Sequence, residues 1–283
     1  HDTVRRQRQM CIRDRNGYKV DREYYYNNAG RQMRILGESL KARYYELLNI
    51  DYDFPEDGYK GDYLKKIAFS LVDDKKDSLL NKPDDFFKDN AEKYIFNQIK
   101  KTLAKIGLKF DNYYNENQLY ENKKIFDVVD KLKNKKLIYE KEGATWFKAT
   151  AIGLEADRVL IKSTGEPTYR LPDIAYHATK FERGYDLCVD IFGADHMDAY
   201  PDVLAAIEQL GFNKSNVKVI IHQFISILED NEIVKMSTRK GNFITLEKLI
   251  DEVGMDVVRY FFIMRSINSC LLYTSPSPRD RVQ

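Results

Sequence analysis

The stretch DLCVDIFGADHMDAYPDVLAAIEQLGFNKSNVKVIIHQFISI, residues 186–227, decides the fold. It opens with a nearly continuous apolar run to Asp195, which is typical of a parallel strand covered on both faces. A helix is predicted next, because Pro201 suits a first turn and Gly211 a C-terminus. The apolar run from Val217 predicts a second strand. Strand, helix and strand in this order indicate a crossover unit, and hence a doubly wound α/β fold with a parallel sheet.

The two ends of the chain differ from the rest, and the codon table relates them to each other. A DNA sequence that encodes MCIRDR (10–15) has a reverse complement that encodes CLLYT (270–274) in another frame. One DNA element in opposite orientations therefore accounts for both ends, as read-through of a sequencing adapter would. We expect 1–15 and 270–283 to be adapter-like and non-native, with two ordinary disordered tails as the alternative.

Composition excludes several classes of protein. The chain has 283 residues, of which 43% are hydrophobic and 32% charged, as expected of a soluble globular protein. We expect no membrane span and no secretory signal, and therefore a cytoplasmic protein without a membrane partner. Without the two ends the formal net charge changes from +2 to −2, so a nucleic acid would have to be held by local patches. Cys188 then stands alone, which excludes a disulfide framework and a cysteine metal site within one chain.

Residue composition and hydrophobic pattern divide the remaining chain into three segments. Residues 16–54 predict a strand, a turn and a helix, as the remnant of the first half of a catalytic domain. Residues 55–145 predict a mainly helical, lysine-rich insertion, and residues 146–269 the second half of the domain with a hairpin near Gly165. Two apolar stripes of the insertion are expected in the core, with the lysines as a solvated face rather than a nucleic-acid patch: Ile95, Phe96, Ile99, Leu103 and Ile106, and Ile125, Phe126, Val129 and Leu132.

Polar residues follow the first strand of the crossover, where such sheets bind ligands. Gly193 would let the backbone approach a ligand closely, and the Asp195 carboxylate could accept hydrogen bonds from ribose hydroxyls. His196 comes next. Glycine and aspartate also occur at such turns for turn geometry and N-capping alone, and that alternative stays open.

A basic loop follows a short strand later in the chain. The sequence KMSTRKG, residues 235–241, precedes Thr245, a candidate N-cap for the helix LEKLIDEV. Lys235, Arg239 and Lys240 suit the charge that builds on phosphate oxygens as pyrophosphate leaves. The alternative is a solvated basic turn.

The loop and the sequence around it resemble those of one protein family. KMSTRKG is similar to the second signature of class I aminoacyl-tRNA synthetases, and residues 16–269 resemble the arginine–tRNA ligases of bacteria. Six further stretches follow that family's order and approximate spacing: REYYYNNAGRQ, PEDGYKGDY, EKEGATWFKAT, DRVLIKSTGEPTYRLPDIAYHATKFERGYD, FGADH and DEVGMDVVRYFFIMRS. Several long motifs in register make the resemblance specific.

The resemblance implies a two-step reaction. L-arginine and ATP, with Mg²⁺, give arginyl-adenylate and pyrophosphate, and the arginyl group then passes to its tRNA. ATP is a substrate of this reaction, with no tightly bound cofactor, and a monomer is expected. Tyr169 and Asp173 match the family's arginine-recognising pair, which suits a planar guanidinium, although Asp173 could instead be a helix N-cap. The resemblance assigns the remaining site residues by position: Gly193, Asp195, His196 and Met236 to ATP binding, and Lys235, Ser237, Arg239 and Lys240 to catalysis, with no protein metal site.

Two departures from the family pattern affect the expected activity. Thr238 stands where many class I enzymes place a second lysine, and Arg239 and Lys240 supply charge nearby. The first signature, His-x-Gly-His on the first strand-to-helix turn, should lie before Asn16, where the adapter-like text stands, and the C-terminal helical domain is also expected beyond this chain. We therefore expect a fragment of a catalytic domain that is itself inactive. The alternatives are another nucleotidyl-transferring enzyme of this fold and a catalytically silent tRNA-binding module.

Overall fold

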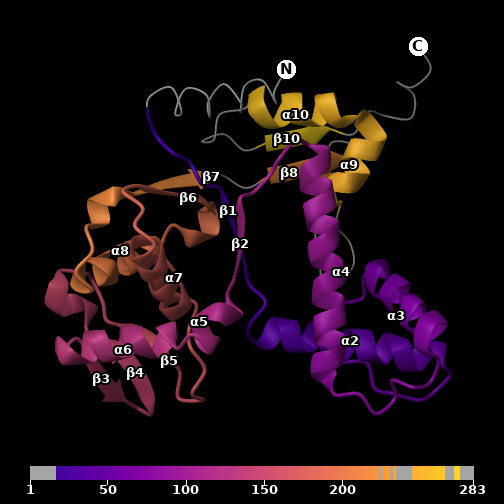
Figure 1. The fold of residues 1–283 in the computed structure, drawn as a ribbon, viewed down its shortest axis with the longest axis horizontal. Coiled ribbons are helices and arrows are strands. Elements are labelled where there is room, and N and C mark those ends of the chain that lie inside the picture. The colour runs from indigo at the N-terminus through magenta and orange to yellow at the C-terminus, as the bar shows by residue number, and fades with distance from the viewer. Residues whose placement is uncertain (1–16, 223–224, 230–231, 234–243, 265–270, 275–283) are drawn as a thin grey trace. The chain divides into compact units, whose positions relative to one another are not determined.

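The computed structural model describes residues 17–222, 225–229, 232–233, 244–264 and 271–274. Contacts divide the chain into two compact units (Figure 1). The first unit takes its described residues from His1–Tyr113, Ser226–Arg265 and Leu272–Gln283, and the second from Tyr114–Ile225 and Ser266–Leu271. Within the described ranges, no helix has both the length and the apolar character needed to cross a membrane.

The crossover unit of residues 186–227 is confirmed. Strands β6 (Cys188–Gly193) and β7 (Val217–His222) pair in parallel along their whole length, and helix α8 (Tyr200–Gln209) lies between them in the chain. The expectation that both faces of β6 are covered is wrong, because Ile191 is 69% exposed. Adjacent side chains of a strand point to opposite faces. One face of β6 therefore meets helix α7 through Asp190, while the described residues leave the face of Ile191 open.

Helix α7 (Arg170–Glu182) is the most buried element of the second unit. It packs against α8, α5 (Asn117–Glu121) and α6 (Lys124–Asn134), as Figure 1 shows. The buried positions of α6 are Ile125, Val128 and Leu132. The stripe expected on this helix is therefore partly wrong: Phe126 is 60% exposed, and Val128 takes the core position instead.

An antiparallel sheet completes this unit, in the order β3 (Ile138–Lys141), β4 (Ala144–Phe147) and β5 (Arg158–Ile161). Its first turn has positive φ at both central residues, Glu142 and Gly143, as a two-residue hairpin requires. The turn expected at Gly165 is confirmed. The amide of Gly165 donates to the Lys162 carbonyl at 2.8 Å, and Ile161 bridges to Pro167.

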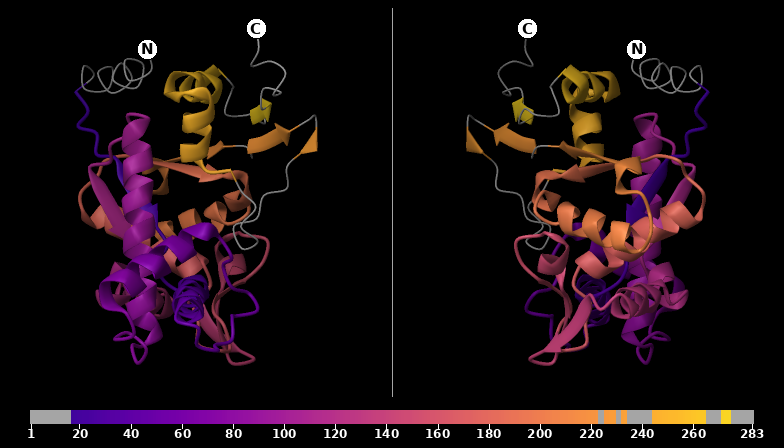
Figure 2. Two further views of the ribbon diagram at one scale, coloured as in Figure 1. Left: turned by 90° about the vertical axis from the view of Figure 1, so that its right-hand side faces the viewer. Right: turned by 90° about the vertical axis from the view of Figure 1, so that its left-hand side faces the viewer.

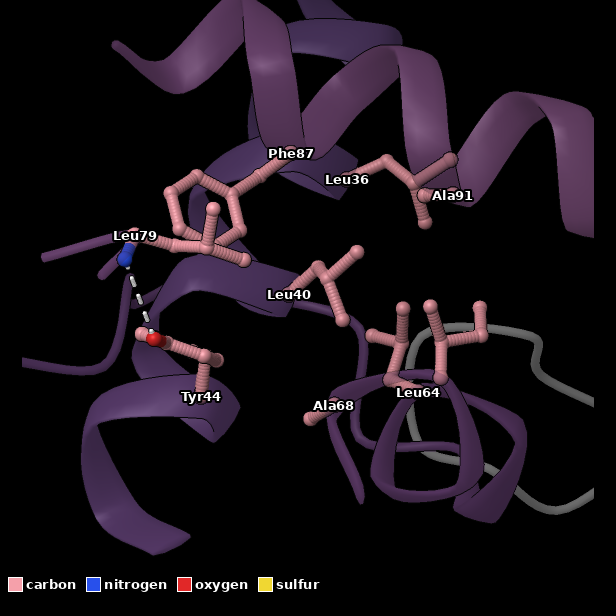
Figure 3. Packing of buried hydrophobic residues seen from close by; sticks show 9 residues of the cluster. Leu36, Leu40, Tyr44, Leu64, Ala68, Leu79, Phe87 and Ala91 are labelled. Carbon is pink, nitrogen blue, oxygen red and sulfur yellow. Dashed lines mark hydrogen bonds between the residues drawn. The ribbon is translucent and has the colours of Figure 1, made fainter. Parts of the chain in front are cut away.

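The longest helices of the first unit are α2 (Arg31–Leu47), α3 (Asp62–Lys75) and α4 (Asp84–Lys105). Figure 3 shows their core, to which all three contribute. Helices α2 and α4 meet at Gly37, where an added Cβ would lie 2.9 Å from the Lys88 Cβ. The stripe from Ile95 to Ile106, expected in the core, is only half-buried, because the fully buried positions of α4 are Phe87 and Ala91.

Shorter elements complete the chain. Strands β1 (Glu23–Tyr26) and β2 (Asn112–Asn115) pair, and a further sheet has the order β10-β8-β9. Its members are β8 (Ile225–Glu229), β9 (Glu232–Ile233) and β10 (Leu271–Thr274), so the structure has a strand inside the segment 270–283. Helices α9 (Leu246–Val253) and α10 (Met255–Met264) pack together, as Figure 2 shows. The N-cap expected at Thr245 is confirmed, since its Oγ1 accepts from the Lys248 amide at 3.1 Å. The described residues also form the 3-10 turns η1 (Ala149–Ile152), η2 (Ala194–His196) and η3 (Lys214–Asn216).

Candidate active site

The first turn of α7 carries two of the residues expected to contact substrate. Tyr169 occupies the N-cap position, and its side chain is exposed. Asp173 lies four residues further on, inside the helix, so its interpretation as the N-cap is wrong. The carboxylate of Asp173 is half-buried and has no hydrogen bond or ion pair within the described part of the chain. A carboxylate in this setting is short of a cationic partner.

Burial is the main reason that the pKa of Asp173 lies above its usual value. The nearby charges of His177, His196 and Lys180 lower this pKa, and the charge of Asp190 raises it again. The effect of burial on this pKa exceeds the effect of the nearby charges, which is consistent with a carboxylate that no described partner contacts directly. The ionised form of Asp173 is thus costly in the unliganded protein.

A buried ion cluster holds the neighbouring part of α7. Asp202, in the first turn of α8, has a side chain that is only 4% exposed. Its Oδ2 accepts hydrogen bonds at 2.8 Å from the Nε of Arg158 on β5 and from the Nε of Arg170 on α7. The Arg170 guanidinium also lies 4.9 Å from the centre of the Tyr169 ring. Asp202 therefore holds the guanidinium of Arg170, which lies against the ring of Tyr169.

A second cluster joins α7 to the middle of β6. The Asp190 carboxylate accepts from His177 Nε2 at 2.9 Å and from the Lys180 ammonium. Burial alone would raise the pKa of Asp190, but the His177 hydrogen bond and the two positive charges outweigh burial and lower that pKa to about 2. The other ring nitrogen of His177, Nδ1, lies 2.8 Å from the backbone carbonyl of Asp173. A carbonyl and an ionised carboxylate can only accept, so each ring nitrogen of His177 faces an acceptor.

The expected nucleotide-binding residues lie at the carboxyl end of β6. Gly193 is the last residue of the strand and pairs with His222 of β7. Its φ of −71° is open to any residue, so the backbone angle does not explain the glycine. The turn η2 follows, and the ring of His196 stacks on that of Phe192 with centroids 5.1 Å apart. Asp195 lies in η2, but its side chain is outside the described structure.

The basic loop lies outside the described residues. Lys235, Met236, Ser237, Arg239 and Lys240 all fall within 234–243. The assignments of these residues, and a cleft between the loop and Asp173, remain predictions from the sequence.

No group of three or more histidine, cysteine, aspartate or glutamate side chains that could hold a metal ion occurs within the described residues.

Reasoning from the sequence missed the Asp190 cluster. The sequence predicts only a structural role for His177, and it singles out neither Lys180 nor Asp190. Two signals were present. Residues 173, 177 and 180 are spaced to share one face of a helix, and Asp190 is a lone carboxylate between the apolar residues of a strand.

The parallel crossover, with its polar turn beyond the carboxyl end of β6, defines a protein of the α/β class, in which ligands bind beyond the carboxyl ends of the parallel strands. Comparison with known proteins narrows this class. The family model described as tRNA synthetases class I (R), catalytic domain, matches residues 12–260. The chain therefore belongs to the family of class I arginyl-tRNA synthetase catalytic domains.

Individual relatives agree with this family. An arginine–tRNA ligase of Desulfotalea psychrophila is 56% identical over 255 residues, which cover 90% of this chain and 46% of the relative. One of Chlorobium phaeobacteroides is 49% identical and covers 92% of this chain and 48% of the relative. The chain thus spans about half the length of these curated relatives.

Solved structures support the fold. A putative arginyl-tRNA synthetase of Campylobacter jejuni superposes with a TM-score of 0.83 at 34% identity, covering 96% of this chain and 59% of that one. A methionyl-tRNA synthetase of Mycobacterium tuberculosis, at 13% identity, superposes with a TM-score of 0.53. The match covers 92% of this chain and 68% of that one. That second likeness concerns the fold alone. The expectation of a class I synthetase α/β fold is confirmed.

Proposed function

We propose that the protein to which this chain belongs attaches L-arginine to its tRNA through an arginyl-adenylate, with ATP and Mg²⁺ as substrate. The observation that carries the proposal is Asp173: a half-buried carboxylate without an ion-pair partner in the described part of the chain, one helical turn from the exposed ring of Tyr169. A planar guanidinium satisfies such a carboxylate through paired, charge-assisted hydrogen bonds, and an aromatic ring beside it accommodates the flat face.

The remaining roles follow the family and the sequence. Gly193, Asp195, His196 and Met236 contact ATP, while Lys235, Ser237, Arg239 and Lys240 stabilise the leaving pyrophosphate. The acceptor is an arginine tRNA, and the whole protein is a cytoplasmic monomer. The two curated relatives described above are both arginine–tRNA ligases, which supports the choice of amino acid.

Calorimetric titration tests substrate recognition on the 283-residue chain. L-arginine and the neutral isostere L-citrulline are compared on the unsubstituted chain and on Asp173→Asn. We expect arginine to bind more tightly than citrulline, and Asp173→Asn to weaken arginine binding about a hundredfold, as the loss of a buried charge-assisted pair does. The matched control is Asp186→Asn, which removes the same charge from an exposed site four residues before Asp190. Equal binding of the two ligands, or undiminished binding to Asp173→Asn, would overturn the proposal.

Catalysis is tested in a chimera. Residues 17–264 replace the matching segment of the Desulfotalea psychrophila ligase, and ATP–pyrophosphate exchange is measured with each of the twenty amino acids. Exchange that depends on arginine alone supports the proposal, whereas exchange with another amino acid identifies a different nucleotidyl-transferring enzyme. A silent tRNA-binding module would show no exchange and would retain RNA in a strongly salt-dependent manner.

A further inference from the structure

We infer that Asp190 is a positioning residue for guanidinium recognition: by pairing with His177 and Lys180 it keeps both side chains from pairing with Asp173. This inference rests on the proposed function, since it concerns the same arginine pocket. It assigns a role to a carboxylate that lies on β6 and contacts no substrate in the proposal above.

The geometry places two potential partners, His177 and Lys180, on the same side of α7 as the substrate-reading carboxylate. His177 follows Asp173 by one turn and Lys180 by two, so the three side chains share one helical face. His177 is tied to this turn directly, because its Nδ1 donates to the Asp173 carbonyl at 2.8 Å. Its ring and the ammonium of Lys180 are close enough to lower the pKa of Asp173.

Both side chains are nevertheless paired with another carboxylate. His177 Nε2 and the Lys180 ammonium each bind one oxygen of Asp190, Oδ2 and Oδ1 respectively. The three side chains are at most 11% exposed, so the Coulomb interactions among them are weakly screened by water. Lys180 also lies 4.3 Å from the centre of the Tyr176 ring, which further holds its ammonium in place.

Asp190 contributes a negative charge to this face of α7. With Asp190 in place, His177 and Lys180 are held by its carboxylate, and the guanidinium of arginine arrives at Asp173, which has no ion-pair partner in the described part of the chain. Without the charge of Asp190, His177 and Lys180 would turn toward Asp173, beside which His196 already lies. The substrate cation would then enter against a more positive field.

The test uses the full 283-residue chain and titration with L-arginine and L-citrulline. Asp190→Asn is expected to weaken arginine binding about tenfold and to leave citrulline binding unchanged, because citrulline carries no side-chain charge. Lys180→Gln removes one of the cations and is expected to change arginine binding in the opposite direction, toward tighter binding. The double variant, Lys180→Gln with Asp190→Asn, is expected to recover most of the arginine affinity.

These outcomes separate electrostatics from packing. A purely structural Asp190 predicts that all three variants weaken both ligands, with additive losses in the double variant. That result, or unchanged arginine binding by Asp190→Asn, would overturn the inference. If Asp190→Asn does not fold, as judged by circular dichroism, the sign of the Lys180→Gln effect decides: weaker arginine binding overturns the inference. Failure of the proposed function is distinct, since the unsubstituted chain would then not distinguish arginine from citrulline, or Asp173→Asn would bind arginine normally.

Discussion

The guanidinium of Arg170 donates to Asp202 Oδ2 at 2.8 Å and lies 4.9 Å from the centre of the Tyr169 ring. One buried carboxylate on α8 thus reaches the rim of the proposed arginine pocket through a single intermediate. The same oxygen also accepts from Arg158 on β5, so this carboxylate ties together three elements of the unit.

The substitution Asp202→Asn tests how much these two hydrogen-bonded ion pairs contribute to stability. Removing the charge leaves two guanidinium groups without their counter-ion, and we expect the free energy of unfolding to fall by about 3 kcal/mol, as for other broken buried pairs. Urea unfolding followed by circular dichroism measures the loss. The control is Asp198→Asn, an exposed aspartate four residues earlier. A loss below about 0.5 kcal/mol, the range of surface substitutions, would contradict a structural role for the cluster.

The ionised Asp190 predicts an acid-dependent part of the stability. Its pKa is lowered from 3.8 to about 2 in the folded protein, so its contribution is present above pH 3.8 and is lost as the pH falls toward about 2. A shift of this size corresponds to about 2 kcal/mol. Urea unfolding between pH 2 and pH 7 measures it as the difference between the unsubstituted chain and Asp190→Asn. A difference that stays constant over this range would show that Asp190 titrates normally.

The crossover and its boundaries could be predicted because local chemistry determines them. An apolar run flanked by turn residues predicts β6 and β7, and the hydroxyl of Thr245 satisfies a helix N-terminus that any helix must cap. The phase of α6 could not be predicted in the same way. Its sequence KIFDVVDKL carries two overlapping apolar stripes, and only packing against α7 selects Ile125 and Val128 over Phe126.

The same distinction between local sequence and tertiary packing applies to the residues of the site. Tyr169 and Asp173 were found by their resemblance to a motif, which needs no knowledge of the fold. The sequence signals around Asp190 did not suffice to assign it, because its role depends on the register that sets β6 against α7 and brings this carboxylate to His177. The exposure of Ile191 could not be predicted either, since it depends on which elements cover the second face of the sheet.

The catalytic role proposed for the basic loop can be tested at Lys235. Lys235→Ala in the chimera should slow adenylate formation by a factor of about a hundred to a thousand, the usual effect of losing one donor that acts in the transition state. The measurement is arginine-dependent ATP–pyrophosphate exchange at saturating arginine. Lys248→Ala is the matched control, since it removes an exposed lysine of the following helix. An unchanged exchange rate would remove Lys235 from the catalytic machinery.

The raised pKa of Asp173 predicts how arginine binding depends on pH. The guanidinium stays charged throughout, so only the ionisation of the protein changes its attraction. Arginine binding by the 283-residue chain should therefore strengthen as the pH rises above 3.8 and through the raised pKa of Asp173. His177, His196, Lys180 and Asp190 also face this carboxylate, and subtraction of the Asp173→Asn profile isolates its contribution. A profile that is the same in both proteins would show that Asp173 does not titrate in this range.

Stability should respond to Asp173 in the opposite sense. A group whose pKa is raised by folding stabilises the folded state below its unfolded pKa, and this contribution is lost as the pH rises through the folded pKa. At neutral pH the Asp173 carboxylate thus costs folding free energy, and Asp173→Asn should be at least as stable as the unsubstituted chain while it binds arginine poorly. Urea midpoints at pH 7, measured beside the calorimetric titrations, test both effects. A variant that loses stability together with arginine affinity would mean that Asp173 supports the fold of α7, and that its carboxylate is not held ready for a substrate cation.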